Sequence, residues 1–346
     1  MKIAQIAPVN QRVPPRRYGG TERVVYYLTE ELVKQGHKVT LFAAAGSETS
    51  ATLIPVVPHP LRDAHILDAS PFTVAEIAKV YKMADKFDII HNHAWPDYLA
   101  FPAAAASKTP TLTTLHNPFT PETKRVFEEY KNLNYVSISK NQRRHCSKLN
   151  FCETVYNGIP VANFPFKNNP DDYLLHVGRI SLQKGTHVAI DVAAALKKEL
   201  IIAAKLDPWE VNYFNQYVAP RLSNGHVHWV GEVDEEERNN LMSKALCLLL
   251  PVTWNEPFGL VMTEAMACGC PVVAYRKGSI PEIVVHGKTG FVVDNEKQMI
   301  RSVKRIGAIN RKTCREHVKE NFNLERMVSS YEKVYNKIID KHKAAK

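Results

Sequence analysis

The chain of 346 residues is 45% apolar and carries a formal net charge of +10, a length and composition that suit two α/β domains better than one. No apolar run reaches the 18 or so residues of a transmembrane helix, and the six cysteines include no Cys-x-x-Cys pair, so we expect neither a membrane span nor a disulfide framework. The positive charge comes without zinc-finger spacing, an RNA-binding aromatic motif or a basic zipper, so nucleic acid is not an expected partner.

Strand-like and helix-like segments alternate along the first half of the chain, which is typical of a parallel sheet with crossover helices. The predicted strands are residues 2–8, 37–45, 87–93, 109–116 and 133–139, and a helix is predicted at 21–36. We expect Thr21 to cap this helix and Gly36 to end it. The opening residues lack the basic n-region and long apolar h-region of a secretory signal, so a cytoplasmic protein is expected.

A stretch rich in Pro, Asn and Asp at residues 157–172 interrupts this pattern and predicts a domain boundary. The alternation then resumes with predicted strands at 173–179, 199–205, 226–233, 246–252 and 270–276 and helices at 185–198, 234–245 and 258–269. Two open α/β domains in tandem predict a ligand site in a cleft, at the carboxyl ends of the strands.

An amphipathic helix is predicted at residues 323–343. It lies in a segment, residues 301–346, that carries 13 basic and 5 acidic side chains. The outer face of this helix is either a solvated surface or a contact for an anionic partner such as a lipid headgroup.

Arg179 and Lys184 follow a predicted strand and precede a predicted helix. A guanidinium, an ammonium group five residues later and a helix N-terminus together form a site for a diphosphate. Taken alone, the two residues could equally be solvated loop cations.

Two carboxylates follow the predicted strand at 246–252. Glu256 precedes a Pro-Phe-Gly turn that starts a helix, and Glu264 lies eight residues later, a little over two helical turns. Such a pair could be the acid and base of a glycosidase. Because a helix N-terminus favours negative charge, we expect instead that both carboxylates accept hydrogen bonds from sugar and ribose hydroxyls, although Glu264 could be an ordinary helix residue.

These motifs resemble the retaining glycosyltransferases of family 4, which have the GT-B fold. The resemblance rests on Gly-Arg with Lys five residues on, on NEPFGLVMTEAMACGCPVVA at 255–274 and on GSIPEIVVHGKTGFVV at 278–293. It implies two Rossmann-like doubly wound domains facing a cleft, an acceptor-binding one at 1–162 and a donor-binding one at 163–322. The helix at 323–346 would cross back to the first domain. The chain departs from the family at Lys277 and Gly278, where two glycines are frequent.

The resemblance also implies roles for individual residues, with Arg179 and Lys184 on the donor diphosphate, Glu256 on the transferred sugar and Glu264 on the ribose. The full set of implied donor residues is Gly19, Gly20, Arg179, Lys184, Gly231, Val233, Glu256, Phe258, Gly259, Leu260 and Glu264, and the catalytic candidates are His116, Arg179, Lys184 and Glu256. Gly19 and Gly20 match the glycine-rich first loop, which would approach the donor phosphate. Gly231 to Val233 would edge the nucleobase pocket.

Two histidine pairs, His91 with His93 and His226 with His228, have the alternate spacing that could chelate a metal ion on one face of a strand. No third ligand stands at a suitable offset, and the family needs no metal for donor binding, so we expect neither a metal nor another cofactor. His116 ends the strand at 109–116 and is expected near the donor sugar, with a packed histidine as the alternative.

The acceptor-side candidates are Arg16, Arg17, His93, Asp97, Ser139 and Lys140. We expect a hexose to pass from a UDP- or GDP-linked donor to a hydroxyl of a glycan, a lipid-linked or a small-molecule acceptor, with retention, and with peripheral contact at the inner membrane face as an option. A sugar-nucleotide epimerase and a non-catalytic GT-B subunit are the rival hypotheses.

Overall fold

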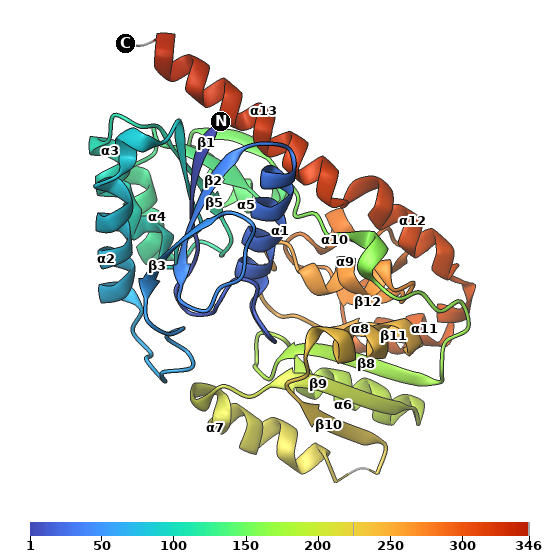
Figure 1. Cartoon of the computed structure of the whole chain (residues 1–346). Helices are drawn as coiled ribbons and strands as arrows, with labels where there is room; N and C mark the ends of the chain where they lie inside the picture. Colours follow the sequence, from blue (N-terminus) through green and yellow to red (C-terminus); the bar gives the residue numbers. More distant parts are fainter. Residues whose placement is uncertain (224, 345–346) are drawn as a thin grey trace. The chain divides into compact units, whose positions relative to one another are not determined.

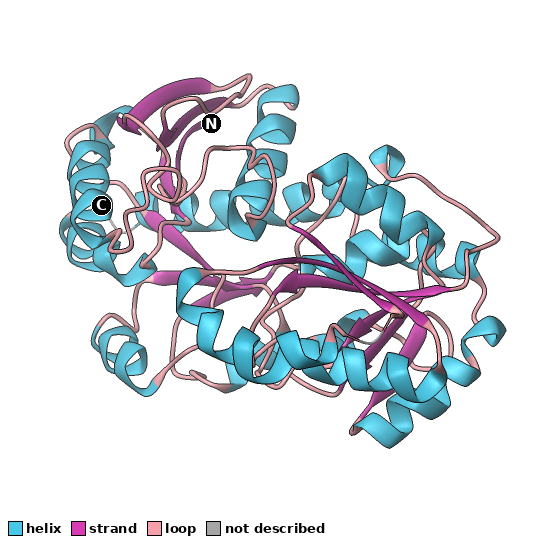
Figure 2. Cartoon of the chain, turned by 90° about the horizontal axis from the view of Figure 1, so that it is seen from below, coloured by secondary structure: helices cyan, strands magenta, loops and turns pink. Residues whose placement is uncertain are grey.

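The computed structural model describes residues 1–223 and 225–344 (Figure 1). It divides into two compact units, one formed by Met1–Gly158 with Leu324–Lys346 and one formed by Ile159–Asn323. In both units the strands form one parallel sheet with helices packed against it (Figure 2).

The first unit is built on a seven-stranded sheet in the order β3-β2-β1-β4-β5-β6-β7. Its strands are β1 (Lys2–Ile6), β2 (Lys38–Ala44), β3 (Thr52–Val57), β4 (Ile89–Asn92), β5 (Thr111–Leu115), β6 (Asn134–Ser137) and β7 (Phe151–Thr154). The central strands β4 and β5 are buried along their whole length, so their apolar runs were visible in the sequence. The edge strands β3 and β7 were not predicted, because they are partly exposed and β3 contains Pro55.

Crossover helices connect these strands: α1 (Gly20–Lys34), α2 (Ser70–Tyr81), α3 (Phe101–Ala106), α4 (Pro121–Glu129) and α5 (Lys140–Arg144), with 3₁₀ turns η1 (Ala84–Lys86) and η2 (Asp97–Ala100). The unit also contains the C-terminal helix α13 (Leu324–Ala344), which is not a crossover.

The ends of α1 confirm one capping prediction and correct the other. Gly36 has φ +85° and ends the helix, where the N–H of His37 donates to the carbonyl of Leu32 at 3.1 Å, as in a Schellman motif. Thr21 is not the N-cap, because the helix begins at Gly20 and Gly19 takes the cap position without a side-chain hydrogen bond. The N-cap and the first residue of α1 are therefore both glycines, Gly19 and Gly20.

The C-terminal helix α13 belongs to the first unit, as the resemblance implied. It packs against α1 and buries one apolar and aromatic stripe, formed by Met327, Val328, Tyr331, Val334, Tyr335 and Ile338. The helical spacing of the sequence predicts this stripe together with Leu324, which is half-buried. None of the helices in the described parts of the chain is long and apolar enough to cross a membrane.

The second unit has a six-stranded sheet in the order β10-β9-β8-β11-β12-β13. Its strands are β8 (Tyr173–Arg179), β9 (Glu199–Lys205), β10 (Val227–Gly231), β11 (Cys247–Leu250), β12 (Val272–Tyr275) and β13 (Gly290–Val293). Its helices are α6 (Thr186–Leu196), α7 (Val211–Tyr213), α8 (Glu235–Lys244), α9 (Leu260–Ala267), α10 (Ile280–Ile283), α11 (Glu296–Lys304) and α12 (Arg311–Asn321). A π-turn η5 (Phe214–Val218) and the 3₁₀ turns η3 (Val161–Asn163), η4 (Pro208–Glu210), η6 (Ala219–Arg221) and η7 (Ile306–Ala308) complete it.

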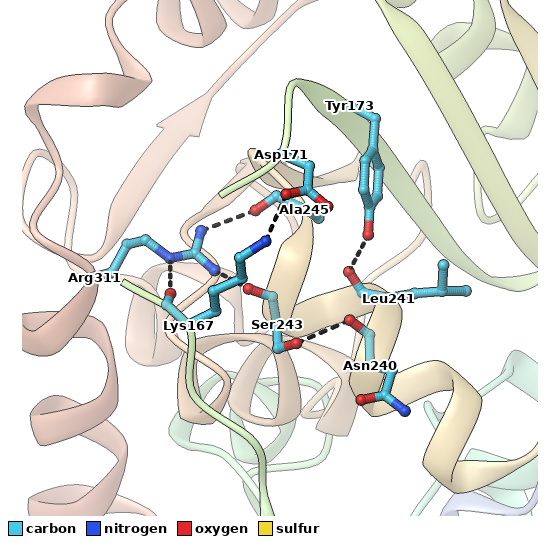
Figure 3. A network of polar contacts seen from close by, with 8 residues as sticks. All are labelled: Lys167, Asp171, Tyr173, Asn240, Leu241, Ser243, Ala245 and Arg311. Carbon is cyan, nitrogen blue, oxygen red and sulfur yellow. Dashed lines mark hydrogen bonds and ion pairs between the residues drawn. The ribbon is translucent and has the colours of Figure 1, made fainter. Parts of the chain in front are cut away.

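Arg311 of α12 ties the segment before β8 to the end of α8 (Figure 3). Its buried guanidinium donates to the carbonyls of Lys167, Ser243 and Ala245 at 2.7, 2.6 and 2.8 Å. Because carbonyl oxygens occupy these donors, Arg311 is a structural cation rather than a free anion-binding group.

Candidate active site

Two cations stand side by side where β8 and β9 end in the second unit. Arg179 closes β8 and pairs in register with Lys205, which closes β9. Between them lies the buried carboxylate of Asp207, at 2.7 Å from Lys205 Nζ and 4.0 Å from a guanidinium nitrogen of Arg179. Arg179 Nε is buried without a hydrogen-bond partner among the described residues, so this guanidinium has donors to offer an anion.

Lys184 joins this group from the loop that follows β8. Its side chain passes close over Gly178, where an added Cβ would lie 3.9 Å from Lys184 Cγ. The ammonium donates to Glu256 Oε2 at 2.6 Å and sits 4.9 Å from the centre of the Trp254 ring. The Trp254 indole donates to the same carboxylate oxygen at 3.0 Å. The structure therefore brings together Lys184 and Glu256, 72 residues apart in the sequence, in the loops that follow the paired strands β8 and β11, and Arg179 ends β8.

The loop that carries Lys184 rests on the segment after β11. At Gly185, which has φ +69°, an added Cβ would lie 2.2 Å from the carbonyl oxygen of Pro251. The same two segments are joined where the N–H of Thr253, two residues after Pro251, donates to the carbonyl of Gln183, two residues before Gly185, at 2.9 Å. Only glycine allows this close approach, which fixes where the ammonium points.

The turn before α9 presents backbone N–H groups beside Glu256. Gly259 is the N-cap of α9 with φ +78°, and an added Cβ would lie 3.2 Å from Glu256 Cγ and 2.8 Å from Met262 Cε. Phe258 is buried and holds the turn against the ring of Phe322. The first N–H groups of a helix have no intrahelical acceptor, so this turn suits a hydroxyl or an anion.

The segment that departs from the family pattern keeps its glycine where the geometry requires one. Gly278 has φ +58°, and an added Cβ would lie 2.2 Å from the carbonyl oxygen of Glu256. Ser279, which sequence reasoning missed, clamps the same turn: its N–H donates to Glu256 O at 2.8 Å and its hydroxyl to Phe258 O at 2.9 Å. The side chain of Lys277 is exposed, so a lysine at the position where the family often has a glycine leaves the turn undisturbed.

Glu264 lies further along α9, and its buried carboxylate pairs with Arg238 of α8 at 3.2 Å. The predicted ribose carboxylate therefore already has a cationic partner. Gly231 ends β10 with φ +80°, at the point where the register with β9 shifts, and both Gly231 and Val233 are half-buried.

In the first unit, the predicted glycine-rich loop packs tightly on itself. An added Cβ at Gly19 would lie 2.7 Å from Pro15 Cβ, whereas Gly20 is exposed at the start of α1. Arg16 and Arg17 are also exposed. In the first turn of α1, burial raises the pKa of Glu22 to about 7, so a carboxyl with a near-neutral pKa lies beside the loop.

His116 follows β5 and contacts His93, with 2.8 Å between His116 Nε2 and His93 Nδ1. Burial lowers the pKa of His116 to about 3, and it lowers the pKa of His91 and of His93 well below the usual value, so all three rings are neutral.

Both nitrogens of His91 and of His93 are engaged in hydrogen bonds. The rings lie on one face of β4, with centroids 3.9 Å apart, as their alternate spacing predicts. His228 of the second pair is exposed and lies 3.8 Å from Glu199. Across residues 1–223 and 225–344, no three His, Cys, Asp or Glu residues are grouped so that they could hold a metal ion.

The remaining acceptor-side candidates differ in accessibility. Asp97 is buried, and desolvation raises its pKa to about 7. Ser139 is fully buried and caps α5 by accepting from the N–H of Gln142 at 3.2 Å. Lys140 is exposed.

Comparisons with known proteins agree with this picture. Residues 162–322 match the family model Glycosyl transferases group 1, and residues 18–162 match Glycosyltransferase Family 4. The chain is 28% identical to the phosphatidyl-myo-inositol mannosyltransferase of Mycolicibacterium smegmatis, over 85% of this chain and 81% of the relative. It is 25% identical to the glycogen synthase of Mycobacterium tuberculosis, over 83% and 81%. HepE of Anabaena, solved with UDP-glucose, superposes with a TM-score of 0.76 at 18% identity, over 97% of this chain and all of that one.

Proposed function

This chain belongs to the family 4 glycosyltransferases with the GT-B fold, and from that premise we propose that it transfers a hexose from a nucleoside diphosphate sugar to a hydroxyl acceptor with retention of configuration. The observation that carries the proposal is the pair of Lys184 and Glu256 in the loops after β8 and β11, with Arg179 at the end of β8. HepE was solved with UDP-glucose, which supports a UDP-linked donor, and a GDP-linked donor is the second choice.

The cations of the second unit have the chemistry to hold a diphosphate. Arg179 offers a planar set of donors, and Lys184 can keep its hydrogen bond to Glu256 while its other two protons face a phosphate oxygen. We propose that these two side chains neutralise the departing diphosphate, so that donor binding requires no metal ion. Stabilisation of this kind typically contributes several kcal/mol to lowering the barrier.

Glu256 and the turn at Phe258 to Leu260 are proposed to hold the sugar. The carboxylate accepts from sugar hydroxyls with the oxygen that Lys184 and Trp254 leave free, and the N–H groups at the start of α9 donate to others. In the first unit, His116 is proposed to hydrogen-bond a ligand hydroxyl.

The proposed reaction exchanges two bonds at the anomeric carbon on one face of the sugar. The bond from this carbon to the phosphate oxygen breaks, and a bond to the acceptor oxygen forms. The acceptor proton passes to the leaving phosphate oxygen, so no protein base is required. Because attack and departure share one face, configuration is retained.

A panel of UDP-, GDP-, ADP- and TDP-hexoses incubated with the full chain in EDTA tests the proposal. We expect slow hydrolysis of one donor class, faster turnover with a hydroxyl acceptor, and a product whose anomeric configuration by NMR equals that of the donor. Nucleotide binding without turnover of any donor would instead indicate a non-catalytic subunit. An inverted product would contradict the same-face reaction.

A further inference from the structure

His116 is the first member of a chain of six hydrogen bonds that runs through the interior of the first unit and ends on α13. The sequence gives no sign of this chain, since two of its links join residues 330 and 244 positions apart. Its members are His116, His93, Gln5, Tyr335, His91, Thr114 and Tyr331. All of them except His116 are fully buried.

Gln5 decides which nitrogen of His116 carries the proton. Gln5 presents its amide oxygen to His93 Nε2 at 3.0 Å, so the hydrogen in this bond belongs to His93. A neutral imidazole has one donor and one acceptor nitrogen, so His93 Nδ1 must accept. The hydrogen between the two rings therefore belongs to His116 Nε2, and His116 Nδ1 keeps a lone pair.

In the other four hydrogen bonds, too, the donor is the group nearer to His116 along the chain of bonds. The amide nitrogen of Gln5 donates to the Tyr335 hydroxyl at 3.3 Å, and that hydroxyl donates to His91 Nδ1 at 2.6 Å. His91 Nε2 then donates to the Thr114 hydroxyl at 2.7 Å, which donates to Tyr331 at 3.0 Å. Turning the Gln5 amide over would reverse every donor and acceptor in the chain, so the state is set cooperatively.

His116 is half-buried, and its Nδ1 is the nitrogen left free. Among the described residues Nδ1 has no hydrogen-bond partner, and it is not one of the buried polar atoms that lack one. A ligand hydroxyl can therefore donate to it. At its opposite edge, the ring is hydrogen-bonded to His93 through Nε2.

We propose that Gln5 and Tyr335 are positioning residues that hold His116 in the Nε2–H tautomer, so that its Nδ1 accepts a hydrogen bond from a ligand hydroxyl. The proposal rests on the proposed function for the identity of the ligand. It assigns the buried face of α13 a part in the reaction besides packing. The low pKa values of the three histidines support it, because protonation of any ring would break the one-donor, one-acceptor order.

The test is the ¹⁵N NMR spectrum of the full chain labelled at histidine, with His116 assigned by its loss in His116→Asn. We expect one neutral tautomer in the wild type, protonated at Nε2. Tyr335→Phe and Gln5→Leu each break the chain between His93 and His91 and should give His116 a mixture of tautomers. Tyr331→Phe is the matched control, because Tyr331 lies buried on the same helix at the far end of the chain.

Measurements of kcat and of the KM for the donor distinguish a positioning role of Gln5 and Tyr335 from a purely structural one. In Gln5→Leu and Tyr335→Phe, kcat should fall about tenfold with little change in the KM for the donor, whereas Tyr331→Phe should keep the wild-type kcat. A wild-type His116 protonated at Nδ1, or equal effects of Tyr331→Phe and Tyr335→Phe, would overturn the inference. The tautomer is read without any donor, so a correct tautomer in a protein that turns over no donor contradicts only the proposed function.

Discussion

Replacing Arg179 by alanine should remove transfer activity while leaving the fold almost unchanged. The nearest acidic partner of Arg179 is Asp207, at 4.0 Å, and Asp207 keeps its shorter contact of 2.7 Å with Lys205. No buried charge is left unpaired, so we expect a loss of less than about 1 kcal/mol in the free energy of unfolding. Loss of one donor to the leaving diphosphate should lower kcat by about 10²-fold, or about 2.7 kcal/mol in the barrier.

Lys184→Ala should behave differently because of its partner. Lys184 and Glu256 are both nearly buried and lie 2.6 Å apart, so removing the lysine leaves a buried carboxylate with only the Trp254 indole as a donor. We expect a similar loss of transfer together with a loss of about 3 kcal/mol in stability. The two variants thus separate the part of Lys184 in folding from its part in donor binding.

The assay combines urea unfolding with initial rates at saturating donor. Arg276→Ala is the matched control, because it removes an arginine from an exposed ion pair with Asp294 in the same unit and should change neither measurement appreciably. Turnover of Arg179→Ala within a few-fold of wild type would refute the assignment of the diphosphate. A loss of stability equal to that of Lys184→Ala would refute the reasoning about Asp207.

Three further variants test other parts of the account. Gly278→Ala should displace Glu256 and lower transfer more than about tenfold, because the added Cβ would lie 2.2 Å from Glu256 O. Gly287→Ala is its control: the backbone there is also left-handed, but no atom lies near the added Cβ, so activity should be retained. Burial raises the folded-state pKa of Glu22 from 4.5 to about 7, so its contribution to stability is present below pH 4.5 and is lost as the pH rises to 7. At pH 8 the free energy of unfolding of Glu22→Gln should therefore exceed that of the wild type by about 3 kcal/mol, with little difference at pH 4. An equal gain at both pH values would contradict this. Gly20→Val should raise the KM for the donor or lower kcat, while UDP affinity in calorimetry should fall less than in Arg179→Ala.

The sequence predicted the elements whose signals are local. The strand at 173–179 was placed at its observed bounds, and the end of the first helix was predicted at Gly36, because buried parallel strands and glycine C-caps leave continuous patterns along the chain. Thr21 was taken for a cap because threonine is a common one, but the helix begins earlier, at Gly20, and its N-cap Gly19 packs closely on Pro15.

The residues that were missed act through pairing across the sheet or through the C-terminal helix. Lys205 lies beside Arg179 only because of the register between β8 and β9. Ser279 hydrogen-bonds Glu256 in a turn that a single serine in the sequence does not predict. Tyr335 was recognised as an apolar position of the helix, but its hydroxyl partners lie on β1 and β4. Such contacts depend on tertiary structure and leave no periodic signal.

The most direct test of the central claim is calorimetric titration of the full chain with UDP and GDP in EDTA, for the wild type and for Arg179→Ala. We expect one of the two nucleotides to bind the wild type without a metal ion and Arg179→Ala to weaken this binding by at least about tenfold. Absence of binding by both nucleotides, or equal affinity of the two proteins, would contradict the claim that this strand end holds the donor diphosphate.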